Sequence, residues 1–301
     1  MTKWLSENRQ LIARLAGSLF AVILLAILVK EESGDEIASA LKRISVWYFL
    51  GGILALFISR LFVVGRWHIL LLSAGVNISL GNTAMITFTG LFGNNFLPTT
   101  IGGDVVRLAG VMQLGYDRAI CLASLIADRL VGILGMCFTL PFGLVPVLAL
   151  SKTVSQAVTI PALFQYGVDF IKRTFGTFMI WLKKPFALSL SFIYTFGNMA
   201  FIFGAVYLLI SGMGHSISYW LVAGLWSLTY FVTLIPISVN GYGVQELSLT
   251  FLLLKFGGLS HSESLAIAVL IRAIFIITSL PGAFFLPSIL AAMNNKKSLT
   301  D

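Results

Sequence analysis

Residues 46–64 read VWYFLGGILALFISRLFVV, an almost wholly apolar run of the length that crosses a bilayer as a helix. Trp47 and Tyr48 open this run, and aromatic side chains of this kind gather at the two membrane interfaces. The polar residues that mark its far end are Arg60, Arg66 and His68. A stretch of this kind decides the fold class, because hydrocarbon is the one solvent in which its surface is exposed without cost.

The rest of the chain has the same character. Of 301 residues, 58% are hydrophobic and 11% are charged, and the mean hydropathy is +0.95. A soluble domain carries charge on roughly a quarter of its residues. The sequence therefore predicts an all-α polytopic membrane helix bundle of about eight membrane elements. Besides 46–64, the apolar or interrupted helices are expected at 11–29, 79–97, 101–113, 119–140, 187–210, 220–236, 244–256 and 264–286.

The net charge of +8 indicates membrane topology rather than nucleic-acid binding. The basic residues flank apolar runs and form no Lys/Arg-rich face with interleaved aromatics. Residues 151–185 form a basic, aromatic connector that is typical of an interfacial amphipathic segment, and the tail 291–301 is basic too. The positive-inside rule then predicts a multi-pass protein of a bacterial-type plasma membrane, with both termini in the cytoplasm.

A weak repeat divides the chain into repeat one (about 1–150), the connector 151–185 and repeat two (186–290), within one integral membrane domain. In each repeat a helix stops at a proline, a glycine-rich break follows, and an acid opens the next helix. The corresponding residues are Pro98, Gly102, Gly103 and Asp104 in repeat one and Pro236, Gly241, Gly243 and Glu246 in repeat two. A later span carries Arg129 or Arg272. Chance similarity, the relative direction of the repeats, and whether the interrupted helices cross or re-enter stay open.

Paired interrupted helices in corresponding positions indicate a transporter-like binding site. Ionisable side chains at membrane depth cost about 2.5–3.5 kcal/mol each, so they are kept where they pair, meet water or bind a ligand. The predicted substrate-binding residues are Asn94, Asn95, Pro98, Gly102, Gly103, Asp104, Arg107, Asp128, Arg129, Asn240, Gly241, Gly243, Glu246 and Arg272.

Each charged candidate has a structural alternative. Asp104 and Arg107 lie three apart on one helical face, so Asp104 is either a helix cap paired with Arg107, or the two lie at a site where Arg107 and the glycine amides face a lipid phosphate. Asp128 and Arg129 point about 100° apart, so each is expected to pair with another helix. Arg129 would pair with Asp104 or Glu246.

The same alternatives hold in repeat two. Glu246 either pairs with Arg272, titrates, or serves as an acid at a helix start. The polar break at 240–246 is expected to line a cavity, because unwound backbone at membrane depth is tolerated only inside protein or beside water.

Catalytic and metal motifs are absent from the sequence. It has no nucleophile elbow, P-loop or Ser/His/Asp order, and its two cysteines and three histidines lack metal-ligand spacing. We therefore expect no metal, no cofactor and no enzymatic activity.

Three motifs in order carry a family resemblance. They are NNFLP at 94–98 with IGGDVVR at 101–107, ADRLVG at 127–132, and PISVNGYGVQE at 236–246. The chain resembles, over nearly its whole length, the transmembrane region of lysylphosphatidylglycerol synthase and its flippase-like relatives. In the synthases a soluble aminoacyl-transferring domain follows this region, whereas this chain ends at Asp301.

The resemblance implies a helix bundle that handles lipid. The leading hypothesis is a flippase that moves a phospholipid or a lipid-linked headgroup between leaflets, with membrane lipids as partners. The alternatives are a membrane enzyme for lipid-linked glycosyl or aminoacyl transfer, and an accessory subunit of a separate lipid-modifying enzyme.

Overall fold

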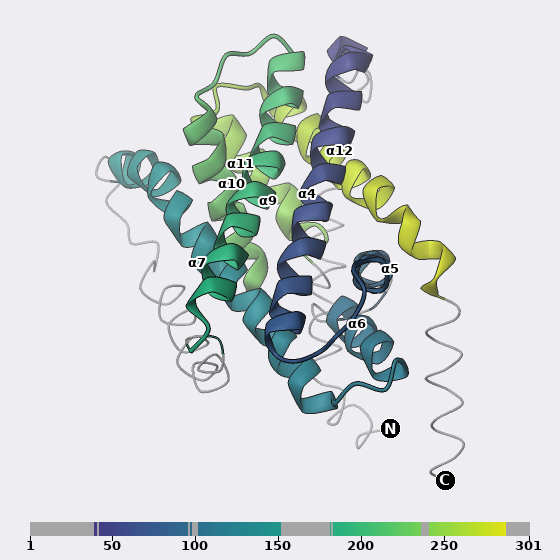
Figure 1. Ribbon diagram of the computed structural model, residues 1–301. Helices are drawn as coiled ribbons and strands as arrows, with labels where there is room; N and C mark the ends of the chain where they lie inside the picture. Colours follow the sequence, from purple (N-terminus) through teal and green to yellow (C-terminus); the bar gives the residue numbers. More distant parts are fainter. Residues whose placement is uncertain are drawn as a thin grey trace, which may run out of the picture.

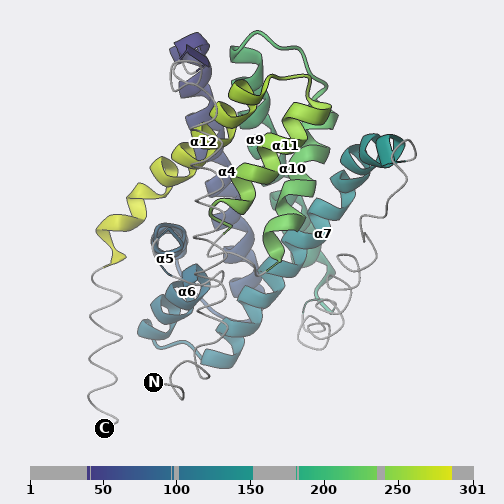
Figure 2. The ribbon, with the colours of Figure 1, turned by 180° about the vertical axis from the view of Figure 1, so that it is seen from behind.

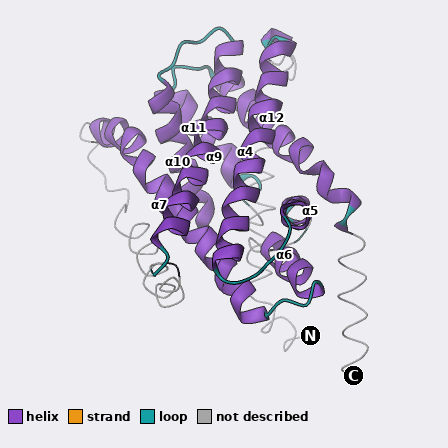
Figure 3. Ribbon diagram, in the orientation of Figure 1, coloured by secondary structure: helices purple, strands orange, loops and turns teal. Residues whose placement is uncertain are grey.

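The computed structural model describes residues 39–40, 42–95, 97, 102–151, 181, 183–235 and 241–286. These residues form helices and no strands (Figure 3), which confirms the all-α fold class. The predicted helix at 11–29, most of the connector, the tail, Pro98 and Asn240 lie outside the described residues. The helices are α4 (Val46–Ser73), α5 (Leu80–Gly93), α6 (Gly102–Gln113), α7 (Arg118–Ser151), α9 (Pro185–Gly212), α10 (Tyr219–Leu234), α11 (Val244–Phe256) and α12 (His261–Ser279), which the 3-10 helix η1 (Leu280–Phe284) extends.

Both halves of the described chain show the same order of helices: long, short, short, long. The long helices α4, α7, α9 and, with η1, α12 are the four that are long and apolar enough to cross a membrane. The short helices α5, α6, α10 and α11 have 12 to 16 residues. Since a span needs about 20 residues, no short helix crosses a bilayer alone.

The two halves run in opposite directions. The first long helices, α4 and α9, pack side by side (Figure 1), and Gly212 near the end of α9 lies against Tyr48 near the start of α4. At the other end of the pair, Gly65 of α4 lies against Tyr194 of α9. These two corresponding helices are therefore antiparallel, which is the arrangement expected of an inverted repeat.

Each pair of short helices is a hairpin that returns to its own end of the bundle. The α5–α6 hairpin begins after the end of α4 and finishes before the start of α7. The end of α4 and the start of α7 lie together, since the Trp67 indole N–H donates to Ser124 Oγ at 3.1 Å. The α10–α11 hairpin lies between the end of α9 and the start of α12, where His215 and Glu263 are 3.1 Å apart. The two hairpins thus enter from opposite ends, and Figure 2 shows both from behind.

Two prolines lie inside α7, where the sequence predicts a span that ends near residue 140, with Pro141 and Pro146 breaking or kinking its end. That boundary is wrong: the helix continues through Pro141 and Pro146 to Ser151. The backbone at Gly143 lies directly against Gly224 of α10, so a neighbouring helix supports this stretch. Such support is what lets membrane helices retain prolines.

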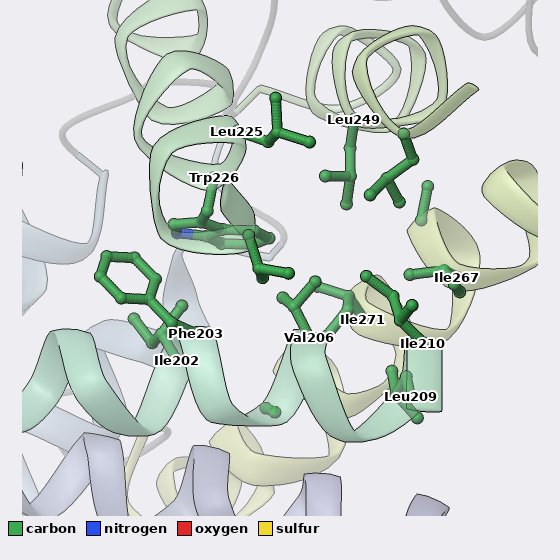
Figure 4. Packing of buried hydrophobic residues seen from close by; sticks show 14 of the residues in the cluster. Ile202, Phe203, Val206, Leu209, Ile210, Leu225, Trp226, Leu249, Ile267 and Ile271 are labelled. Carbon is green, nitrogen blue, oxygen red and sulfur yellow. The ribbon is translucent and has the colours of Figure 1, made fainter. Parts of the chain in front are cut away.

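The largest apolar core belongs to the second half. Figure 4 shows Phe203 and Val206 of α9 on the side of Trp226 of α10, with Leu249 of α11 and Ile271 of α12 in the same cluster. Two smaller apolar clusters in the first half involve Trp67 and Trp181, which are fully buried. Charged groups occupy much of the remaining interior of the first half.

Candidate functional site: a charge ladder and a sealed ion pair

Five charged side chains from α4, α6 and α7 alternate in sign along one line of contacts. We call this set, Arg66–Asp128–Arg107–Asp104–Arg129, the charge ladder. Asp128 Oδ1 accepts from Arg66 Nε at 2.7 Å, and Asp128 Oδ2 accepts from both terminal nitrogens of Arg107 at 3.1 Å. Asp104 accepts from Arg107 Nη1 at 3.2 Å and from Arg129 Nε. Three helices are therefore joined by charge-assisted hydrogen bonds, which are the strongest class in proteins.

The ladder runs from a packed interior to an accessible end. The side chain of Asp128 is 3% exposed, that of Asp104 is 21% exposed and that of Arg129 is 34% exposed. Three guanidinium groups face two carboxylates, so among the described residues the ladder carries one extra positive charge. The most accessible member of the ladder, Arg129, is one of its three cations.

Polar and aromatic neighbours hold the ladder in place. The guanidinium of Arg107 lies over the ring of Trp67, 4.1 Å from the ring centroid, and Arg66 Nη1 donates to Thr195 of α9 at 3.3 Å. A planar guanidinium suits both kinds of contact. Tyr230 of α10 lies within electrostatic range of Arg66 and Arg129, so the second half of the chain borders the ladder.

The second half holds a matching but smaller constellation. Glu246 is the third residue of α11, as Asp104 is of α6, and it accepts from Arg272 Nε on α12. Glu246 also accepts from the Gly243 amide at 2.7 Å, and the guanidinium of Arg272 lies 4.4 Å from the ring centroid of Tyr242. The Arg272 side chain is 13% exposed and that of Glu246 is 5% exposed. This pair is neutral and largely enclosed.

The two helix breaks meet each other. Asn95, at the end of α5, donates to Ser279 Oγ at the end of α12 (2.8 Å), and its carbonyl accepts from the Tyr242 hydroxyl (3.3 Å). Gly241 and Gly243 have φ of 72° and 77°, a left-handed backbone that few other residues adopt. The joint between the hairpins thus lies between the ladder and the Arg272–Glu246 pair.

A close crossing of α5 and α6 places Asp104 and Arg107. A Cβ on Gly103 would lie 2.5 Å from the carbonyl oxygen of Gly90, so both positions require glycine. The Gly103 amide donates to Asn94 Oδ1 at 2.6 Å. Asn94 thus caps this helix start, while the reading in which Arg107 and the glycine amides face a lipid phosphate stays a prediction.

Several contacts predicted from sequence are confirmed. Arg129 pairs with Asp104, Arg107 pairs with Asp104, and Glu246 pairs with Arg272. Asp128 and Arg129 pair with other helices rather than with each other. Gly102 begins α6 and is buried.

Sequence reasoning missed Arg66. We placed it beyond the end of a span at residue 64, but α4 continues to Ser73, so Arg66 lies within the helix and binds Asp128. The polar residues after 64 looked like a boundary because their partners, Asp128 and Thr195, are distant in sequence. The available signal was the apolar run ILLL at 69–72, which follows His68 and continues the span.

Metal-ligating groups do not cluster in the part of the chain that the structure describes: it holds no group of three His, Cys, Asp or Glu side chains arranged to bind an ion. The acids of the described interior are instead bonded to arginines. The site's chemistry is therefore that of fixed charges and hydrogen bonds.

The family comparison agrees with this geometry. The family model described as the lysylphosphatidylglycerol synthase TM region matches residues 14–171 and 149–282. The chain belongs to this family. A search of curated proteins gave no match. Membership in the lysylphosphatidylglycerol synthase TM region family, with four helices able to span, makes the chain an integral membrane protein related to lipid synthesis or flipping.

Proposed function

We propose that the protein is a lipid translocase, which binds a phospholipid or lipid-linked headgroup in its polar interior and moves it between leaflets. The observation that carries the proposal is the charge ladder. A row of ion pairs inside a membrane bundle is costly, and such rows mark substrate or ion pathways. Its accessible end, Arg129, presents a guanidinium of the geometry that binds phosphate in a bidentate manner.

The inverted hairpins supply a route for the headgroup. Transporters place their substrate where interrupted helices from two inverted repeats meet, and relative movement of the repeats opens the site to either side. Here the α5–α6 and α10–α11 hairpins enter from opposite ends and touch at Asn95 and Tyr242. The headgroup would pass this joint while its acyl chains stay in the bilayer.

Topology follows from charge. Arg118, Lys183 and Lys184 lie at the end of the bundle where α4 ends and where α7 and α9 begin. By the positive-inside rule this end would face the cytoplasm of a bacterial-type plasma membrane, together with both chain termini. Membrane lipids would be the partners, and a separate lipid-modifying enzyme would supply a modified substrate.

Group transfer on a lipid carrier is the alternative function. It needs a carboxyl group that can exchange a proton with the substrate. Asp104, Asp128 and Glu246 each accept hydrogen bonds from arginine, so their carboxylate oxygens are engaged within the bundle. These pairs favour transport over catalysis.

A reconstitution experiment tests the proposal. Vesicles of phosphatidylethanolamine and phosphatidylglycerol would carry an acyl-labelled phosphatidylglycerol, and bleaching of the outer leaflet would report its transbilayer movement. We expect faster movement than in protein-free vesicles, and slower movement with Arg129→Gln than with Arg118→Gln, an exposed arginine outside the ladder. Equal rates in all vesicles, with and without protein, would reject translocation of this lipid class.

A further inference from the structure

Arg60 lies at the centre of α4, a helix long enough to cross a membrane. It has thirteen or more residues of α4 on each side, so it lies about 20 Å from either helix end. A guanidinium at this depth has the highest cost of any position along the span. Yet no ion pair of Arg60 with a carboxylate occurs within the described residues.

The surroundings of Arg60 are aromatic on one side. Its guanidinium carbon lies 4.7 Å from the ring centroid of Phe275 on α12. Its Nε is shut off from solvent and has no hydrogen-bond partner among the described groups. A ring face offsets part of the cost of burying a cation, but it cannot accept the in-plane N–H bonds of the guanidinium.

Arg60 stands between the two charged constellations. On α4 it precedes Trp67, the ring under Arg107, by seven residues, which is two turns on the same face. On α12, Phe275 follows Arg272 by three residues, which is one turn. A second unpartnered buried donor, Gln245 Nε2, belongs to the amide whose oxygen accepts from Arg272 at 3.2 Å.

Charge balance separates Arg60, which is half-buried, from the arginines that have a carboxylate partner. Arg66 and Arg107 share Asp128, and Arg272 has Glu246. Segments 98–101 and 236–240, which lie in the sequence between α5 and α6 and between α10 and α11, contain no Asp or Glu. The interior around Arg60 thus offers a fixed positive charge and unused N–H donors in a low-dielectric setting, which favours a bound anion.

We propose that Arg60 forms a phosphate-binding site midway between the charge ladder and the Arg272–Glu246 pair. The ligand class is a phosphate group, carried by a lipid headgroup or free in solution. In a translocase, which this inference takes from the proposed function, the site would hold the headgroup phosphate at the halfway point. Arg60 would donate from Nε and a terminal nitrogen to two phosphate oxygens.

A binding experiment tests the site without measuring transport. Purified protein in neutral detergent would be titrated with short-chain phosphatidylglycerol, with inorganic phosphate and with short-chain diacylglycerol, and its melting temperature recorded. We expect phosphatidylglycerol to raise the melting temperature of the unaltered protein. Arg60→Gln should weaken this binding about tenfold or more, and Arg60→Lys should retain part of it. Arg118→Gln, an exposed arginine, is the matched control.

The three ligands separate the outcomes. Protection by phosphatidylglycerol alone assigns the site to a lipid phosphate, and equal protection by inorganic phosphate assigns it to a free anion. Unchanged phosphatidylglycerol affinity in Arg60→Gln, or equal protection by diacylglycerol, overturns the proposal. Arg60-dependent binding in a protein that moves no lipid would reject the translocase and keep the site. If Arg60→Gln left both translocation and phosphatidylglycerol binding unchanged, the Arg60 site would be rejected and the translocase function would be retained.

Discussion

Each of the two helix breaks has an ion pair of the same kind, and the two pairs differ in their surroundings. Asp104–Arg129 in the first half and Glu246–Arg272 in the second join the third residue of a short helix to the following long helix. In the first half three more charged side chains extend the pair inward as the charge ladder, and Arg129 of the pair is its accessible end. In the second half apolar side chains and Tyr242 enclose it. One inverted scaffold thus holds a polar half that suits a moving headgroup and an apolar half that suits a stable support.

The largest expected effect is on the buried carboxylate of the ladder. Asp128→Asn removes the negative partner of Arg66 and one of the two negative partners of Arg107, and breaking a buried ion pair costs about 3–5 kcal/mol. We expect little folded protein to be recovered, as measured by the monodisperse fraction in size-exclusion chromatography and by the melting temperature.

Glu246→Gln sharpens that comparison. It removes the ion pair of one arginine, whereas Asp128→Asn removes ion pairs to two, and the amide oxygen of glutamine can still accept from the Gly243 amide. Its melting temperature should therefore fall less than that of Asp128→Asn. The opposite order would show that the second-half pair, and not the ladder, holds the bundle together.

The next effect concerns the close crossing of α5 and α6. Gly103→Ala places a methyl group against the Gly90 carbonyl, and overpacking of this kind costs about 1–3 kcal/mol. Gly81→Ala, on the same hairpin but with open space around it, is the control and should be neutral or slightly stabilising. Equal melting temperatures for the two variants would contradict the crossing.

A third comparison separates function from stability. Arg129 lies at the accessible end of the ladder and Arg272 lies in the enclosed pair. Arg129→Gln should change stability by less than about 1 kcal/mol, as expected for partly exposed ion pairs, while slowing translocation strongly. Arg272→Gln should lower the melting temperature more. If both variants lost stability equally and transported equally, the two halves would not have different roles.

The smallest effect is at the joint between the hairpins. Tyr242→Phe removes the hydroxyl that donates to the Asn95 carbonyl and keeps the ring beneath Arg272. We expect a loss of about 1 kcal/mol, which is the usual net value of one hydrogen bond. A chemical denaturation midpoint in detergent measures it, and a loss several times larger would mean that the joint carries more of the bundle than this single contact.

Much of this architecture could be read from local sequence. Proline and glycine mark both breaks, and the acid that opens each following helix pairs with the later arginine as expected. What could not be read was long-range geometry. The antiparallel packing of α4 on α9, which makes the repeat inverted, depends on contacts such as Gly65 with Tyr194.

Two further misses have the same physical cause. The end of α4 was placed too early because Arg66 looked like an interfacial residue, whereas Asp128 neutralises it inside the bundle. The predicted span ends near residue 140 because local chemistry favours a break or a kink at Pro141 and Pro146, whereas packing of Gly143 on Gly224 supports a helix that continues. In both places a distant neighbour overrides a local signal.

A density map from electron cryomicroscopy, of the protein in phosphatidylglycerol nanodiscs, tests the central claim most directly. The account predicts headgroup density within hydrogen-bonding distance of the Arg129 guanidinium, reaching inward toward the joint at Asn95. Acyl-chain density alone around Arg129, with a dry and closed interior behind it, would contradict the account.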